Sequence, residues 1–139
     1  MMTELAKAPE GARHLLITSR MPVRWGDMDA YGHVNNTVYF RYMEQVRVEW
    51  LEQMGSVVRP DNAVAPVIIN AACTFLKPMN YPGTVEVRTY VDKPGRSSVQ
   101  THVDMLIDDE LCAEGSAKVV WMNTQSGKSV PIPDSVRAV

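Results

Sequence analysis

Hydrophobic residues recur along the chain at two different spacings. Between residues 37 and 54 they recur every three or four positions, at Phe40, Met43, Val46, Trp50 and Met54. This spacing is typical of the buried face of one helix. Asn35 or Asn36 can serve as its N-cap, and Gly55 stands where a C′ glycine belongs. The pattern predicts one long amphipathic helix over residues 37–54.

In the rest of the chain, apolar and polar residues alternate, as they do in half-buried strands. The first such run covers residues 15–25, where Pro22 favours an edge strand or a bulge. Four further runs follow the helix, over residues 67–75, 85–91, 99–107 and 111–122. The connections between these runs are short, so we expect antiparallel strands in a four-stranded meander.

One strand, one long helix and four further strands predict an α+β fold. A five-stranded antiparallel sheet would curve around the single apolar-striped helix. At 139 residues the chain is long enough for one domain with a sizeable core. We expect a flexible lead-in over residues 1–13, the domain over residues 14–133 and a tail over residues 134–139.

Composition and charge narrow the possible functions. The formal net charge is -2, which gives no electrostatic case for binding nucleic acid or an anionic membrane. Cys73 and Cys112 lie far apart in strand-like runs, so we expect two buried thiols and neither a zinc site nor a disulfide. The first residues do not resemble a secretory signal, and no apolar window is long enough to span a bilayer. We therefore expect a cytoplasmic protein.

The candidate chemistry is concentrated in residues 24–44, RWGDMDAYGHVNNTVYFRYME. Asp27 and Asp29 are two positions apart at the start of this segment, and we expect the two carboxylates to do different jobs. Gly32 permits a tight turn that leads to the helix start. There, free N–H groups and the helix dipole favour negative charge. An N–H at the first turn, near Asn35 and Asn36, can stabilise a developing oxyanion.

Several alternatives remain open for these residues. One aspartate can simply cap the helix while the other is solvated. A calcium loop is excluded because Tyr31 and Val38 stand where ligands are needed, but Asp27, Asp29 and His33 can still ligate a transition metal. His33 can act as a base, bind a substrate carbonyl or bond a loop carbonyl. A nucleophilic serine of the G-x-S-x-G type is not present.

With this motif and element order, the whole chain resembles the hotdog-fold acyl-CoA thioesterases of the 4-hydroxybenzoyl-CoA thioesterase family. The resemblance implies that Asp29 is the catalytic carboxylate, acting as nucleophile or as base. It also implies that the backbone N–H of Asn36 polarises the thioester carbonyl and that Gly32 lets this carbonyl approach. His33 can assist Asp29, and Tyr31 and Asn35 are further candidates for substrate binding.

The resemblance also implies partners and leaves two other functions open. Coenzyme A would be part of the substrate, no cofactor would be needed, and Arg96, Ser97 and Ser98 are candidates for binding its phosphates. Family members form dimers or tetramers with the site at the dimer interface, where partner residues around positions 70–75 would line the acyl pocket. A hydratase or dehydratase acting on acyl thioesters, or a non-catalytic acyl-CoA-binding module, would fit the same fold. His33, Asn35 and Asn36 stand where the name-giving members carry aromatic residues, which favours a broader acyl-CoA substrate class.

Overall fold

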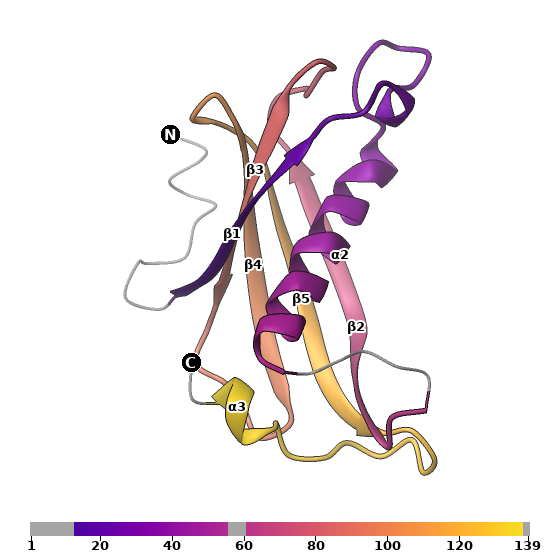
Figure 1. Cartoon of the computed structure of the whole chain (residues 1–139), viewed down its shortest axis with the longest axis vertical. Helices are drawn as coiled ribbons and strands as arrows, with labels where there is room; N and C mark the ends of the chain where they lie inside the picture. Colours follow the sequence, from indigo (N-terminus) through magenta and orange to yellow (C-terminus); the bar gives the residue numbers. More distant parts are fainter. Residues whose placement is uncertain (1–12, 56–60, 138–139) are drawn as a thin grey trace.

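The structure is a computed structural model that describes residues 13–55 and 61–137. A five-stranded antiparallel sheet lies behind one long helix, which confirms the predicted α+β architecture (Figure 1). The strands are β1 (His14–Pro22), β2 (Val64–Phe75), β3 (Thr84–Val91), β4 (Ser98–Ile107) and β5 (Glu110–Asn123). The helices are η2 (Trp25–Asp27), α2 (Asn36–Gln53) and α3 (Asp134–Arg137). Apart from Arg13, the predicted lead-in lies outside the described residues.

The strand order in the sheet is β1-β3-β4-β5-β2, which corrects one prediction. Only β3, β4 and β5 form a meander, because β2 pairs with β5 and β1 takes the place beside β3. The chain therefore crosses the sheet twice, once from β1 to β2 through α2 and once from β2 back to β3 through residues 76–83. The second crossing is short, but it follows the end of the sheet at which α2 begins (Figure 1).

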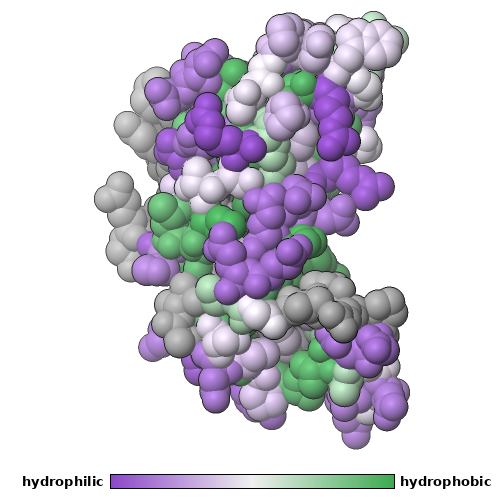
Figure 2. Space-filling model, viewed as in Figure 1, coloured by the Kyte–Doolittle hydropathy of each residue, from purple (hydrophilic) through white to green (hydrophobic). Residues whose placement is uncertain are grey.

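Helix α2 begins and ends where the sequence places its caps. Asn35 is the N-cap, and its side-chain oxygen accepts the N–H of Thr37 at 2.9 Å. Gly55 has a φ of +77°, the left-handed conformation expected of a C′ glycine. In the view of Figure 2, hydrophilic residues cover the outward face of this helix, and hydrophobic surface is visible on either side of it.

Two details of the predicted pattern are wrong. Phe40 is 36% exposed, and the buried residues of α2 are Tyr39, Tyr42, Met43, Val46, Trp50 and Leu51. Tyr39 and Tyr42 lie at helical spacing from Met43 and Val46, so the stripe runs through them and leaves Phe40 to one side. The first strand ends at Pro22, and Trp25 is 77% exposed in η2.

A buried core fills the space between the sheet and α2. The largest fully buried side chains in the described part of the chain include Trp50, Met43, Trp121 and Met105. Gly115 of β5 lies directly beneath the helix, where an added Cβ would come within 2.8 Å of the Met43 sulfur and 3.3 Å of the Ala72 carbonyl oxygen. The absence of a side chain at Gly115 therefore sets how closely α2 approaches the sheet.

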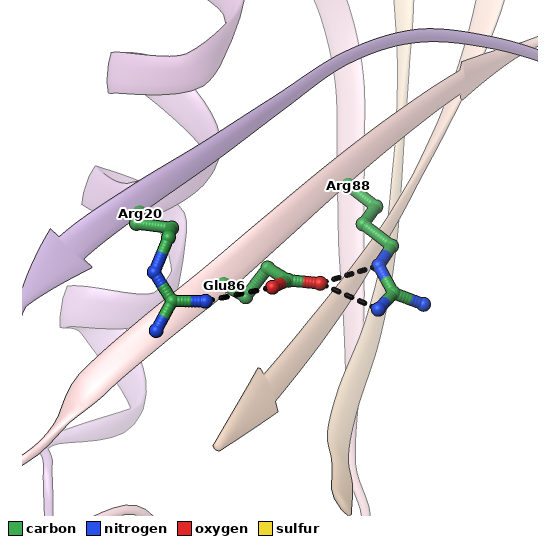
Figure 3. A network of polar contacts seen from close by, with 3 residues as sticks. All are labelled: Arg20, Glu86 and Arg88. Carbon is green, nitrogen blue, oxygen red and sulfur yellow. Dashed lines mark hydrogen bonds and ion pairs between the residues drawn. The ribbon is translucent and has the colours of Figure 1, made fainter. Parts of the chain in front are cut away.

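The outer face of the sheet carries ion pairs that join β1 to β3. Arg20 and Glu86 are cross-strand partners, and Arg20 Nη1 lies 2.9 Å from Glu86 Oε1 (Figure 3). The second carboxylate oxygen accepts Arg88 Nε at 2.6 Å, so two guanidiniums hold one carboxylate. Because the Arg20 side chain is 66% exposed, the pair contributes at most about 1 kcal/mol. Its main effect is to favour this register of the two strands.

The C-terminal end of the described chain packs against the opposite end of the sheet from the start of α2 (Figure 1). Residues 134–137 form α3, whose Val136 is only 2% exposed. Arg137 Nη2 donates to the carbonyl oxygens of Gly95 and Arg96 at 2.9 and 3.0 Å. This helix therefore holds the β3–β4 turn. No helix among the described residues is long and apolar enough to cross a membrane.

Candidate active site

A tight turn over residues 28–34 leads into α2. Its ends form an antiparallel bridge between Met28 and Val34, and Asp29 N donates to the His33 carbonyl at 3.0 Å. Gly32 has a φ of +80°, a conformation that side-chain-bearing residues rarely adopt. Because nothing lies within 4 Å of a Cβ added there, the glycine serves the turn by its backbone conformation.

The carboxylate of Asp29 is held by two neutral hydrogen bonds. Its Oδ1 accepts the N–H of Tyr31 at 2.9 Å, and its Oδ2 accepts Asn35 Nδ2 at 3.2 Å. Among the ion pairs of the described residues, none involves Asp29. The group is therefore oriented without a neighbouring cation to neutralise it, as a base or nucleophile requires.

Asn35 links this carboxylate to the start of α2. Its Nδ2 donates to Asp29, while its Oδ1 accepts both the N–H and the hydroxyl of Thr37. Val38 N donates to the Asn35 carbonyl at 2.9 Å. Within the described chain this leaves the N–H of Asn36, the first residue of the helix, without a protein acceptor.

A cavity of about 310 Å³ brings these groups together. Its lining residues are Asp29, His33, Val34, Asn36, Tyr39, Phe75, Leu76, Lys77 and Pro78. The rings of Tyr39 and Phe75 meet edge to face, with centroids 4.8 Å apart. The cavity thus places a carboxylate and a helix start beside an apolar wall, and it lies next to the edge strand β2.

Asp27 does a different job from Asp29, because η2 ends at Asp27 and the backbone between the two residues is not a regular strand. Its Oδ2 accepts the hydroxyl of Tyr42 at 2.8 Å and the backbone N–H of Arg24 at 2.9 Å. Burial, followed by this hydrogen bond to Asp27, raises the pKa of Tyr42. Asp27 therefore ties η2 to the buried face of α2, and it is not among the residues that line the cavity.

Sequence reasoning missed the contribution of the connection between β2 and β3. Residues 75–78 form one wall of the cavity, and Val34 N donates to the Met79 carbonyl at 2.8 Å. Asn80 Nδ2 donates to the Gly32 carbonyl at 2.6 Å and lies 3.2 Å from His33 Nδ1. The only sequence signal for this connection is the Lys77-Pro78 pair that ends the strand pattern.

The remaining predicted site residues lie in other places. The Tyr31 side chain is 88% exposed, and only its backbone N–H contacts the site. Arg96, Ser97 and Ser98 lie at the β3–β4 turn, about 23 Å from the cavity end of β3, the length of seven strand residues. The structure therefore does not bring them to this cavity within one chain. Lys77, by contrast, lines the cavity and forms an exposed ion pair with Glu110 at 3.0 Å.

The described residues offer little support for metal or thiol chemistry. They contain no group of three or more His, Cys, Asp or Glu side chains that could hold a metal ion. Both cysteines are free. Cys112 is buried as predicted, whereas the prediction that Cys73 is buried is wrong, because Cys73 is only partly buried. Partial burial raises the pKa of Cys73 to about 11, and Cys73 does not line the cavity.

Comparisons with known proteins agree with this arrangement. Residues 23–139 match the family model of the thioesterase-like superfamily. A candidate thioesterase from Pseudomonas aeruginosa, the PA2801 protein, has 42% sequence identity and a TM-score of 0.86, covering 90% of this chain and 98% of its own. The BH1999 gentisyl-coenzyme A thioesterase has 27% identity and a TM-score of 0.79, covering 87% of this chain and 99% of its own.

A curated plant relative is similar over most of the sequence. It is an acyl-acyl carrier protein thioesterase, ATL3, from the chloroplast of Arabidopsis thaliana. The two sequences are 29% identical over 126 residues, which is 85% of this chain and 64% of the relative.

Proposed function

This chain belongs to the thioesterase-like superfamily, and we propose that it hydrolyses an acyl-CoA to the free acid and coenzyme A through Asp29. Membership of this superfamily, and similarity to a gentisyl-coenzyme A thioesterase, support hydrolysis of an acyl thioester in general. To this general activity the proposal adds three assignments. Asp29 is the catalytic group, coenzyme A carries the acyl group, and the enzyme works as a homodimer. It needs no cofactor, because coenzyme A is part of the substrate.

The observation that carries the proposal is the composition of the cavity wall. Asp29 and the first residue of α2 border the same space, and the rings of Tyr39 and Phe75 border it too. A thioester carbonyl placed there would lie between a carboxylate and a free backbone N–H at the positive end of a helix. The acyl chain would contact the apolar wall.

The reaction follows from these positions. As a base, Asp29 takes a proton from water, and the hydroxide adds to the carbonyl carbon. The oxyanion then collapses, the C–S bond breaks, and coenzyme A leaves as a thiol after taking up a proton. As a nucleophile, Asp29 would instead form a mixed anhydride with the acyl group, which water then hydrolyses. In both routes the N–H of Asn36 stabilises the oxyanion.

We further propose that the working enzyme is a homodimer joined through β2. This twelve-residue strand is at the edge of the sheet, and its Val64, Val67, Ile68, Ile69 and Phe75 are 37–49% exposed in the single chain. A long apolar edge strand invites pairing with another strand. A second copy would cover it and close the cavity on the β2 side. Lys77 at the cavity wall is a cation for the coenzyme A phosphates.

The first test removes the carboxylate. Asp29→Asn keeps the shape of the side chain, and we expect the rate of thiol release from short, long and aromatic acyl-CoAs to fall by about 10²–10⁴-fold. Asp27→Asn is the matched control and should retain most activity. An unchanged rate in Asp29→Asn contradicts the proposal, and so does hydration of an enoyl-CoA without thiol release.

The second test removes a single backbone donor. Proline is favoured at the first position of a helix, and Asn35 has a φ of -62° and a ψ of 140°, which suits a residue before proline. Asn36→Pro therefore deletes the N–H while keeping α2, and we expect a rate loss of about 10²–10³-fold. Asn36→Ala keeps the N–H and should retain activity. Equal rates in the two variants would exclude the oxyanion role.

A further inference from the structure

Asn80, which lies outside the sequence motif, contacts both His33 and the backbone of Gly32 through its side-chain nitrogen. Asn80 Nδ2 lies 2.6 Å from the carbonyl oxygen of Gly32 and 3.2 Å from Nδ1 of His33. Asn80 belongs to the connection between β2 and β3, more than forty positions away along the chain. No pattern in the sequence pairs these residues.

The first contact fixes which way the amide of Asn80 points. A backbone carbonyl oxygen can only accept hydrogen bonds, so the atom 2.6 Å from Gly32 O must be the amide nitrogen and not the amide oxygen. The opposite orientation would press two oxygens against each other. The group that faces the His33 ring is therefore an NH₂.

The orientation of this amide in turn fixes the proton on the imidazole. An NH₂ group has two hydrogens and no accepting lone pair, so it donates one hydrogen to Gly32 and the other to His33 Nδ1. Nδ1 must then carry a lone pair. In a neutral imidazole the proton therefore resides on Nε2.

We propose that Asn80 is a positioning residue that holds neutral His33 in the Nε2–H form, so that His33 donates a hydrogen bond to the thioester and does not serve as the base. This inference rests on the proposed function, because it assigns roles within the same cavity, which both Asp29 and His33 line. Of these two residues, Asp29 is then the one that accepts a proton from water. Nε2–H of His33 is a second donor for the carbonyl oxygen or the departing sulfur.

The backbone around Asn80 is well placed to keep this geometry. Val34 N donates to the carbonyl of Met79, whose side chain is only 1% exposed. On the other side, Tyr81 N donates to the sulfur of Met28 at 3.4 Å. Asn80 thus stands between two contacts with the ends of the turn that carries His33.

The test replaces the donor with an acceptor of the same shape. In Asn80→Asp, the carboxylate cannot donate to the Gly32 carbonyl and would rotate away from it, and its oxygen would accept a hydrogen bond from Nδ1, draw the proton there and leave Nε2 as an acceptor. We expect ¹⁵N NMR of histidine-labelled protein, at a pH where the imidazole is neutral, to report Nε2–H for His33 in the parent and Nδ1–H in the variant. The His33 signals are identified by their loss in His33→Gln.

The kinetic expectation separates a donor role from a purely structural one. Losing one hydrogen bond in the transition state should lower kcat by about tenfold and change KM little. Asn123→Asp makes the same chemical change at a distant turn, where Asn123 Oδ1 accepts the N–H groups of Gln125 and Ser126, and it should leave the His33 signals and kcat unchanged. Circular dichroism is the check that both variants are folded.

The outcomes are decisive in either direction. An Nδ1–H signal for His33 in the parent, or an unchanged tautomer in Asn80→Asp, would overturn the positioning role. A switched tautomer with an unchanged kcat would overturn the donor role. The NMR readout does not need turnover, so it remains valid even if Asp29→Asn shows that the proposed function is wrong.

Discussion

At the scale of single residues, the site depends on amide side chains that each make two directed contacts. Asn35 orients Asp29 with its nitrogen and caps α2 with its oxygen. An amide is the group that can do both, because it has a donor and an acceptor on one planar head. Serine or aspartate would cap a helix equally well but would not donate to Asp29 as an amide does.

Because of this dual role, a substitution at Asn35 can change the activity without changing the stability. Asn35→Asp keeps the cap, so we expect the free energy of unfolding to change by less than about 1 kcal/mol. The new carboxylate faces Asp29 Oδ2 in place of a donor, and thiol release should fall at least about tenfold because two like charges repel. Denaturant titration and steady-state kinetics measure the two effects. A large loss of stability with normal turnover would contradict this division.

The two cysteines lead to a prediction about reactivity. Desolvation raises the pKa of Cys73 to about 11 and also raises that of Cys112. The thiolate is the reactive form, so both thiols should react slowly with iodoacetamide near pH 8 in the folded protein and fast after denaturation. The folded protein holds these protons more tightly than the unfolded chain, so labelling should accelerate between pH 9 and 11. Fast labelling of the native protein at pH 8 would contradict this.

At the scale of helices and strands, the contact between α2 and Gly115 of β5 gives a prediction about packing. Gly115→Ala places a methyl group 2.8 Å from the Met43 sulfur. Met43 is buried at 1% exposure, so it can move only by displacing its neighbours. We expect a loss of about 1–3 kcal/mol in the free energy of unfolding, measured by denaturant titration. Gly26→Ala is the control, since nothing lies within 4 Å of an added Cβ there.

The secondary structure was largely predictable from local patterns. The alternation of Val85, Val87 and Val91 and the stripe of α2 each need only neighbouring residues to be recognised. The order of the strands was not predictable in this way. The pairing of β2 with β5 depends on how the chain crosses the end of the sheet, which is a property of the whole fold.

The residues of the candidate site also fall into those that local patterns predict and those that depend on the whole fold. Asp29, His33, Asn35 and Asn36 lie in one continuous segment, so they can be named as candidates from the sequence without knowledge of the fold. Tyr39 looks like an ordinary helix residue. Phe75, Lys77 and Asn80 reach the site only because the second crossing of the sheet passes the start of α2. No local spacing predicts such a contact.

At the scale of the whole molecule, the exposed edge strand gives a prediction about assembly. Ile69→Lys places a charge on β2 at a residue that is 49% exposed in the single chain. We expect this variant to sediment as a monomer and to lose most thiol release, because the cavity lies beside this edge. Leu15→Lys, at a residue equally exposed on the other edge strand, should remain dimeric and active. If both variants sediment as dimers, β2 is not the interface.

The two ends of the sheet are unequal, and this has a practical consequence. The lining of the cavity includes the first residue of α2, and α3 and the β3–β4 turn lie at the opposite end of the sheet from this helix start (Figure 1). Ser135 of α3 is exposed, whereas both native thiols have a raised pKa. A Ser135→Cys substitution would thus give a selective handle for immobilisation, with the cavity facing the solution rather than the support.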